Sequence, residues 1–302
     1  MEKIVECVMN VSEGRVAATL QAITTEIEAT TGVYLLSCMS DADHHRSVIS
    51  FIGNPGSIQE AAFAAVTKAV ELIDLRRHHG VHPRVGAVDV IPFIPLKQAT
   101  MEECSTVARQ LGRKIATHLK IPVYLYAQAS FRRQRKELSS IRKGGIELLS
   151  GEIQKNHERA PDFGPSRLHP TAGATIVGAR HPLIAYNVYL DTTAVTIARE
   201  VAGRIRESAG GLEGIKALGF YIPARNLAQV SMNVEDYVAT PLPKLFERVN
   251  MESCRLGARA LSSEIVGLVP EEALPPSALA KLKLESFHSS QILEKRITEV
   301  LG

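Results

Sequence analysis

The stretch RSVISFIGNPGSIQEAAFAAVTKAVELI, residues 46–73, decides the fold class. Its first eight residues, Arg46 to Gly53, are rich in β-branched and aromatic side chains, which is typical of a strand. Ser57 is followed three residues later by Glu60, the pattern of a capping box, and predicts the start of a helix. Apolar residues recur there at helical spacing, at Ile58, Ala62, Val66, Val70 and Ile73. The chain is therefore expected to combine strands and helices closely along the sequence.

Similar patterns continue on both sides of this stretch. Strands are expected over residues 4–11, 33–39 and 87–94, and a helix over residues 15–29, so the first third has the order βαββαβ. A second capping box, Thr100 with Glu103, predicts a helix through Leu119. A further strand over residues 123–127 and a helix near Ile146 follow.

The same order of elements begins again near residue 183. Strands are predicted over 183–190, 215–222, 227–234 and 264–269, and helices over 193–207 and 241–258. Each βαββαβ half is expected to form a split βαβ sheet. The predicted fold class is therefore α+β, with two ferredoxin-like (split βαβ) subdomains whose sheets are covered by helices. The expected boundaries are residues 1–180 and 181–302, the second including a helical tail after Pro275 and Pro276.

Composition excludes several classes of protein. The 302 residues include 35 Lys+Arg and 32 Asp+Glu, a net charge of +3, with 45% hydrophobic residues, which is typical of a globular protein. Trp is absent and aromatics make up 5%, so nucleic-acid binding is not expected. No apolar run approaches the roughly 20 residues of a membrane span. Charges at Glu2, Lys3 and Glu6 exclude an export signal, and four scattered cysteines favour a reducing compartment. A cytoplasmic location is expected.

Histidines are concentrated in a loop between a predicted helix and a predicted strand. His78, His79 and His82 fall within five residues, and Pro83 restricts the backbone of His82 to extended geometry. Imidazole can accept or donate a proton near neutral pH, and catalytic groups often stand on loops held by a rigid scaffold. Either a catalytic histidine or a solvated, flexible loop fits this pattern.

A second group of the same kind, His44, His45, Asp41 and Asp43, raises the possibility of a zinc or manganese site. The pair His78 and His82 has the spacing of a helical chelate, but Gly80 and Pro83 disfavour a helix there. A metal-dependent hydrolase is kept as an alternative. Asp89 is the only charge in its predicted strand and is expected either to be paired, for example with His82 or Arg84, or to lie at an exposed edge.

Two further segments are candidates for ligand contacts. Residues 161–175, PDFGPSRLHPTAGAT, are dense in Gly and Pro and lie between the two halves, where they form either a shaped binding loop or a linker. The basic run from Arg132 to Lys136 either holds an anionic part of a ligand or forms a solvated face.

Several long motifs resemble the glutamate formimidoyltransferase family. They are VECVMNVSEG (5–14), DHHRSV (43–48), GVHPRVGAVD (80–89), PDFGPS (161–166), GAR (178–180), NLAQVSMN (226–233) and VGLVP (266–270). They occur in order through nearly the whole chain. The resemblance implies transfer of the formimino group of N-formimino-L-glutamate to N5 of tetrahydrofolate in histidine degradation. It also implies a homodimer, with tetrahydrofolate as co-substrate and no metal.

The resemblance also implies roles for particular residues. The catalytic histidine of the family falls on His82, and its folate-binding segment falls on Gly164, Pro165, Ser166, Arg167, Leu168, His169, Pro170, Thr171, Ala172 and Gly173. We expect His82 to carry a proton from the folate amine to the departing glutamate nitrogen. Some relatives carry a fused cyclodeaminase domain, and a stand-alone form without it is expected here.

Supporting residues follow from the chemistry of the substrates. Arg46 or Arg84 is expected to bind a substrate carboxylate through its planar fork of donors, and Asn10 and Ser12 to contact the folate. The acids expected to orient His82 are Asp89, Asp41 or Asp43. Departures from the family pattern at Met9, Ser37 and His45 motivate a further alternative, a non-catalytic folate-binding paralogue. Use of another donor such as N-formylglutamate is left open.

Overall fold

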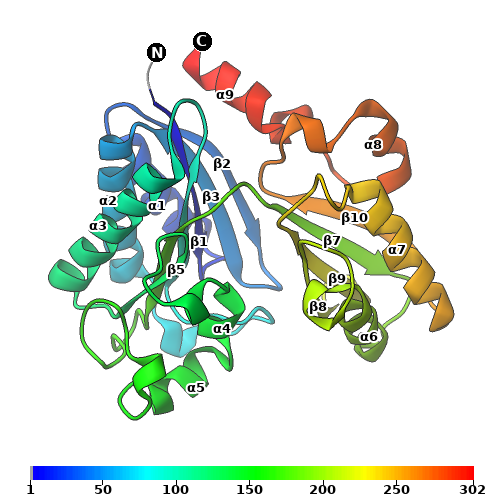
Figure 1. The fold of residues 1–302 in the computed structure, drawn as a ribbon, viewed down its shortest axis with the longest axis horizontal. Helices are drawn as coiled ribbons and strands as arrows, with labels where there is room; N and C mark the ends of the chain where they lie inside the picture. Colours follow the sequence, from blue (N-terminus) through cyan, green and yellow to red (C-terminus); the bar gives the residue numbers. More distant parts are fainter. Residues whose placement is uncertain (1–2) are drawn as a thin grey trace. The chain divides into compact units, whose positions relative to one another are not determined.

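The structure, a computed structural model, describes residues 3–302 and divides into two compact units. Unit 1 runs to His181 and unit 2 begins at Pro182. Each unit has its own sheet and its own hydrophobic core (Figure 1). The predicted α+β fold class is confirmed.

The sheet of unit 1 has six strands in the order β2-β3-β1-β4-β6-β5. Their bounds are β1 Val5–Val11, β2 Val33–Asp41, β3 Arg46–Gly53, β4 Val88–Pro95, β5 Val123–Ala127 and β6 Thr175–Ala179. The four strands β2-β3-β1-β4 pair antiparallel and form the predicted split βαβ sheet. Strands β6 and β5 extend it through parallel pairs. Strand β6 lies just after the Gly- and Pro-rich segment and was not predicted.

Helices cover both faces of this sheet. The helices α1 (Ala17–Glu28), α2 (Pro55–Leu72) and α3 (Met101–Leu119) pack on one face, as Figure 1 shows. On the other face of β4, β5 and β6, Ile141 and Leu149 from α4 (Leu138–Arg142) and α5 (Gly145–Glu152) pack against Tyr124 and Tyr126. The added strands are therefore buried on both sides.

The start of α2 differs from the prediction. The helix begins at Pro55, and the Asn54 side chain caps it by accepting hydrogen bonds from Gly56 N (3.0 Å) and Ser57 N (2.9 Å). The predicted capping box of Ser57 and Glu60 is therefore wrong, because Asn54 followed by Pro55 is the stronger start signal. The second predicted box is confirmed at α3, where Thr100 and Glu103 cap reciprocally.

Unit 2 contains the second βαββαβ pattern. Its sheet has the order β10-β7-β9-β8, all antiparallel, with β7 Ile184–Leu190, β8 Ile215–Ile222, β9 Leu227–Val234 and β10 Ala260–Val266. Strand β10 begins four residues before the predicted start at Glu264. The helices are α6 Val195–Ile205, α7 Leu242–Arg255, α8 Pro276–Leu282 and α9 Leu293–Leu301. Of these, α6 and α7 pack on one face of the sheet.

Six short 3₁₀ turns join the larger elements among the described residues: η1 Leu75–Arg77, η2 Arg133–Arg135, η3 His157–Arg159, η4 Glu207–Ala209, η5 Glu271–Ala273 and η6 Ser289–Gln291. No helix within residues 3–302 is both long enough and apolar enough to cross a bilayer.

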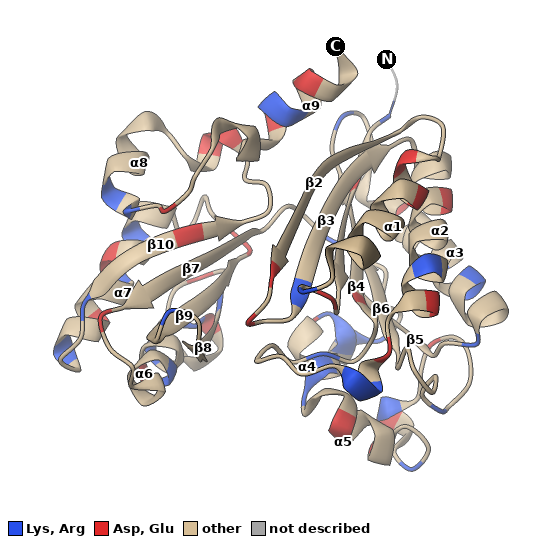
Figure 2. Cartoon of the chain, turned by 180° about the vertical axis from the view of Figure 1, so that it is seen from behind, with Lys and Arg blue, Asp and Glu red and all other residues tan. Residues whose placement is uncertain are grey.

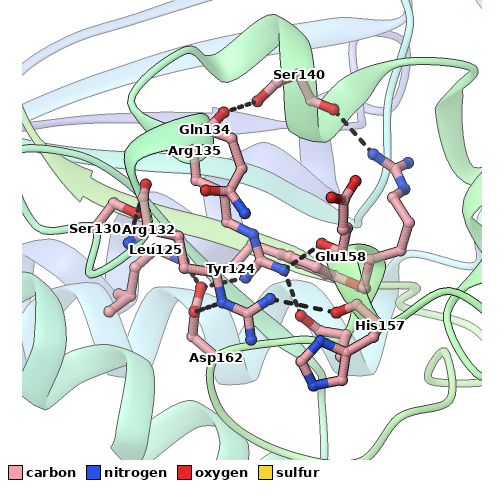
Figure 3. A network of polar contacts seen from close by, with 12 residues as sticks. Tyr124, Leu125, Ser130, Arg132, Gln134, Arg135, Ser140, His157, Glu158 and Asp162 are labelled. Carbon is pink, nitrogen blue, oxygen red and sulfur yellow. Dashed lines mark hydrogen bonds and ion pairs between the residues drawn. The ribbon is translucent and has the colours of Figure 1, made fainter.

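The basic run after β5 is in part structural. Lys and Arg gather around α4 (Figure 2), but Arg135 is buried and is bonded within unit 1. Its guanidinium pairs with Asp162 (2.6 Å), donates to the carbonyls of Glu158 and Ala160, and stacks on the Tyr124 ring (Figure 3). Asp162 also accepts from Leu125 N at 2.8 Å. This network ties the segment after α5 to β5, so Arg135 does not form part of a solvated basic face.

Candidate active site

Three loops of unit 1 meet at the end of the sheet where β1 and β2 stop. They are the segment after β1, the turn between β2 and β3, and the loop between η1 and β4. The backbone approach is close: a Cβ on Gly80 would lie 2.4 Å from the carbonyl oxygen of His44, and one on Gly14 would lie 2.2 Å from that of Asp41. Glycine at both positions lets the loops come together and brings His44, His45, His78 and His82 into one group, here called the histidine cluster.

His82 is held through both ring nitrogens. Its Nδ1 lies 2.8 Å from the Pro83 carbonyl oxygen, and its Nε2 lies 2.6 Å from Nη1 of Arg46, the first residue of β3. A carbonyl only accepts and a guanidinium only donates, so Nδ1 carries the proton and Nε2 is the acceptor. The imidazole is therefore neutral, with its basic nitrogen directed at Arg46.

The electrostatics of the site favour this neutral form. Burial, together with the positive charges of Arg46 and Arg142, lowers the pKa of His82 well below its ordinary value of 6.5. Burial and the charge of Arg142 also lower the pKa of Arg46 to about 10, while Asp89 and Asp41 oppose that shift. Arg46 thus stays cationic at neutral pH, whereas His82 remains available as a base.

Asp41 contacts His44, and the His44 ring lies between Asp41 and His82. Its carboxylate accepts from His44 N (2.8 Å) and is 2.9 Å from His44 Nδ1. Burial raises the pKa of Asp41, but the hydrogen bonds from His44 outweigh it and leave the pKa below its usual value. The His44 and His82 rings are 6.2 Å apart between centroids. Asp43 contributes its carbonyl oxygen, which accepts from Val81 N at 3.3 Å and ties the turn to the His82 loop.

Glu13 contacts the histidine cluster, and no role was predicted for it from the sequence. Its Oε1 accepts from Arg15 N (2.7 Å) and Val16 N (3.0 Å) at the entry to α1, and it is 3.2 Å from His45 Nε2. Burial raises the pKa of Glu13, but these hydrogen bonds outweigh it and lower the pKa overall. The sequence did offer a signal for Glu13, because this residue lies in the motif VECVMNVSEG (5–14), between the end of the predicted strand and Gly14.

His45 and His78 form a stacked pair within the cluster. Their rings are 4.1 Å apart at an interplanar angle of 6°, and His78 Nε2 lies 2.7 Å from the His45 carbonyl oxygen. Burial is the main cause that lowers the pKa of His78, to about 4. The stack joins the β2–β3 turn to the loop that carries His82.

Asp89 has different partners from those expected. It is buried and accepts from Val85 N at 2.7 Å and from the Arg142 guanidinium, which comes from the last turn of α4. The prediction that Asp89 pairs with Arg84 is wrong, as is the alternative that it lies at an exposed edge, because α4 and α5 cover β4. Arg84 donates to the His78 carbonyl (3.1 Å) and lies 3.5 Å from Glu147 Oε1. No local pattern in the sequence pointed to Arg142.

A cavity of about 470 Å³ opens beside the cluster. Residues lining it come from the His82 loop, from α5 and from the segment after residue 160; they are Leu75, Arg76, His78, His79, Arg84, Ile146, Glu147, Ser150, Leu168, His169, Pro170, Thr171 and Gly173. Backbone bonds fix this last segment to the loop: Leu75 N donates to Thr171 O, and Ala87 N to Ala172 O, both at 2.9 Å. Gly164, Pro165, Ser166, Arg167 and Ala172 lie in the same segment but do not line the cavity.

The expected folate contacts near β1 are engaged within the protein. Asn10 is buried and donates from Nδ2 to Val8 O at 3.2 Å, and Ser12 Oγ donates to Gly86 O at 2.7 Å. Within residues 3–302, no three His, Cys, Asp or Glu side chains are placed to hold one metal ion, so the structure adds no support to the metal-dependent alternative.

Comparisons with known proteins give matches over nearly the whole length of the chain. The profile described as "Formiminotransferase domain, N-terminal subdomain" matches residues 4–180, and "Formiminotransferase domain" matches residues 185–298. The glutamate formimidoyltransferase of Streptococcus pyogenes serotype M1 is 43% identical over 98% of this chain and 99% of its own. That of Thermoplasma acidophilum is 43% identical over 97% of both chains. The formimidoyltransferase-cyclodeaminase of Sus scrofa is 41% identical over 92% of this chain and 52% of its own length.

Proposed function

The chain belongs to the formiminotransferase family, and from this membership we propose that it is a glutamate formimidoyltransferase. It transfers the formimino group of N-formimino-L-glutamate to N5 of tetrahydrofolate, giving 5-formiminotetrahydrofolate and L-glutamate, a step of histidine degradation. Tetrahydrofolate is a co-substrate in this reaction. The observation that carries the proposal is the match to named transferases over nearly the full length of both chains.

The reaction needs one proton to move between two nitrogens. The N5 amine attacks the amidine carbon of the donor, and a tetrahedral intermediate forms with a new N5–carbon bond. N5 then loses its proton, the glutamate nitrogen gains one, and the bond from carbon to that nitrogen breaks. One positioned imidazole can perform both transfers, a contribution of about 10²- to 10⁴-fold.

In this proposal His82 is the base, because its Nε2 is unprotonated and its pKa is lowered. Arg46 holds that nitrogen at 2.6 Å. A carboxylate of the bound substrate would compete for the Arg46 donors and release Nε2 toward N5, since a carboxylate is the preferred bidentate partner of a guanidinium. Arg46 then both binds the substrate and exposes the base.

We assign the orienting role to Asp41, which fixes His44 beside His82. Asp89 acts indirectly. It pairs with Arg142, and the positive charge of Arg142 helps to keep His82 neutral. The cavity lined by residues 168–171, by Gly173 and by Arg84 is the proposed place for folate, and His169 and Thr171 supply polar atoms there. The segment Gly164 to Gly173 is retained as the folate-binding segment.

The proposal includes the organisation of the whole protein. Residues 1–180 form the N-terminal and residues 181–302 the C-terminal formiminotransferase subdomain. The active protein is a homodimer in the cytoplasm. These statements rest on the family resemblance and on the pattern of cysteines in the sequence.

A direct transfer assay tests the function. Purified protein, dialysed against a chelator, is mixed with tetrahydrofolate and N-formimino-L-glutamate, and 5-formiminotetrahydrofolate and L-glutamate are measured. We expect equal amounts of both products. Folate binding without transfer would favour the non-catalytic paralogue. Release of L-glutamate without 5-formiminotetrahydrofolate, seen only after zinc or manganese is added, would favour the hydrolase. A parallel arm with N-formyl-L-glutamate defines the donor.

A further inference from the structure

Unit 2 carries a group of polar side chains that the proposed mechanism does not use. Asn187 and Tyr189 alternate along β7 with core residues, so they point away from the face covered by α6 and α7. Asn187 is paired in register with Glu264 on β10, and Tyr189 with Gln229 on β9. These four residues are called the Glu264 cluster. Gln229 and Glu264 lie within or next to two of the sequence motifs described above, without an assigned role.

Hydrogen bonds in the cluster converge on one oxygen of Glu264. Its Oε1 accepts from Asn187 Nδ2 (2.8 Å), from the Tyr189 hydroxyl (2.8 Å) and from Gln229 Nε2 (3.4 Å). Three donors at one oxygen fix the orientation of the carboxylate, and Oε2 is the oxygen directed away from them. The cluster therefore holds Glu264 rigidly while one oxygen remains available to accept.

Gln229 presents a second acceptor. Its side chain is fully buried, and its Oε1 has no hydrogen-bond partner. The amide cannot simply be reversed, because that would bring Oε1 against the Glu264 carboxylate, where a donor is required. Burying an acceptor without a donor costs free energy. Buried polar groups that have no partner within the protein are commonly paired with a ligand or a water molecule.

The charge next to the cluster does not satisfy these acceptors. The Arg225 guanidinium stacks on the Tyr189 ring at 4.1 Å and pairs with Glu285 at 2.5 Å. Its Nη1 is thus directed to Glu285, while its positive charge lies over the ring. What the cluster offers is a fixed carboxylate oxygen and an amide oxygen, both acceptors, from β10 and β9, the two strands that flank β7. The complementary group is one that presents N–H donors on two nitrogens joined through one carbon.

We propose that the Glu264 cluster is a binding site for an N–C–N donor group, with Glu264 Oε2 and Gln229 Oε1 accepting from its N–H atoms. This inference rests on the proposed function, because both substrates of the transferase contain such a group. In N-formimino-L-glutamate it is the formimino amidine, and in tetrahydrofolate it is the 2-amino-pyrimidinone part of the ring. The cluster recognises the chemistry the two sources share.

Glu264→Gln tests the inference with little change in shape. The three donors keep an oxygen at the Oε1 position, so the new amide nitrogen occupies the Oε2 position and opposes an N–H group. Calorimetry with each substrate alone needs no turnover. We expect the affinity for one substrate to fall about tenfold or more. A loss confined to N-formimino-L-glutamate, with N-formyl-L-glutamate unaffected, identifies the amidine, and a loss confined to tetrahydrofolate identifies the ring.

Gln229→Met is the second variant, and it separates binding from folding. It removes the unpaired buried oxygen, so the melting temperature should hold or rise while the same affinity falls. Glu252→Gln is the matched control, since Glu252 is a buried carboxylate of unit 2 that pairs with three arginines on the helical side. It should leave both affinities unchanged.

Unchanged affinities in both cluster variants overturn the inference and leave the proposed function standing. Binding that depends on the cluster, in a wild-type protein that performs no transfer, overturns the proposed function alone. A wild-type protein that binds neither substrate overturns both.

Discussion

Units 1 and 2 use the same arrangement of four strands for different purposes. In unit 1 the order β2-β3-β1-β4 is extended by β6 and β5, and in unit 2 the order β10-β7-β9-β8 stands alone. The extension brings α4 and α5 onto the second face of the unit 1 sheet. The histidine cluster of unit 1 lies in loops at the strand ends. In unit 2 the polar cluster lies on the sheet itself.

The two kinds of site are kept in place in different ways. Loop residues such as His82 need external supports, and here these are the ion pair of Asp89 with Arg142, the contact of the Glu13 carboxylate with the His45 ring, and the close backbone approach of Gly80 to His44. Residues on a strand are positioned by the register of the sheet, as Glu264 is beside Asn187. Unit 1 should therefore depend more on buried ion pairs than unit 2 does.

The largest effect is expected for His82→Ala, which removes the base from unit 1. The value of kcat should fall by about 10²- to 10⁴-fold, because no other group can carry the proton between the two nitrogens at the same rate. Substrate affinity should change little, and the steady-state transfer assay separates kcat from KM. His288→Ala, an exposed histidine of unit 2, should retain wild-type activity. Equal activity of His82→Ala and wild type would remove His82 from the mechanism.

Asp162→Asn tests the dependence of unit 1 on buried ion pairs. The side chains of Asp162 and Arg135 are each 4% exposed, so the variant leaves a buried guanidinium without its carboxylate (Figure 3). We expect a loss of about 3 kcal/mol in the free energy of unfolding of unit 1. Hydrogen exchange should accelerate at β5 amides and stay unchanged at β9 amides.

The matched change in unit 2 is Glu252→Gln. Its carboxylate is as buried as that of Asp162, but its partners Arg204, Arg248 and Arg255 are 39%, 37% and 58% exposed. Water can solvate these arginines when the carboxylate is lost, so the cost should be smaller. An equal or larger loss for Glu252→Gln would contradict the distinction between the units.

Arg46→Met tests how the charges around His82 set the pH dependence of activity. His82 acts in its neutral form, and its pKa is lowered by burial and by the charges of Arg46 and Arg142. Activity is therefore present above this lowered pKa and is lost as the pH falls through it. Without Arg46 the imidazolium is less disfavoured, so the pKa rises and the acid limb of kcat/KM moves to higher pH. Arg204→Met, on α6 of unit 2, should leave the limb in place.

Local signals in the sequence were enough to predict most elements of both units. Strands such as β3, β5, β8 and β9 follow from short apolar runs between turn residues, and the cap of α3 follows from Thr100 and Glu103. Strand β6 was missed because five residues after a Gly- and Pro-rich loop show little periodicity. Its identity as a strand depends on parallel pairing with β4 and β5, which are distant in sequence.

The candidate site was predictable in its residue types and not in its contacts. The loop of His82 and the turn of Asp41 were both recognised, and the structure brings them together. The partner of Asp89 is 53 residues away on α4, and that of His45 is 32 residues away after β1. Such pairs depend on how loops fold over the sheet, and spacing along the chain carries no information about it.

The smallest effect is expected at the start of helix α2. Asn54→Ala removes the side chain that caps α2, and it should lower the free energy of unfolding of unit 1 by about 1 kcal/mol. Ser57→Ala should cost less, because the Ser57 hydroxyl makes only long contacts, 3.4 Å to Asn54 O and 3.5 Å to Gly32 O. The corresponding helix of unit 2, α7, starts after Pro241 without a side-chain cap, so unit 2 offers no equivalent loss. Urea unfolding of the two variants gives the comparison, and a greater loss for Ser57→Ala would restore the capping box that the sequence first indicated.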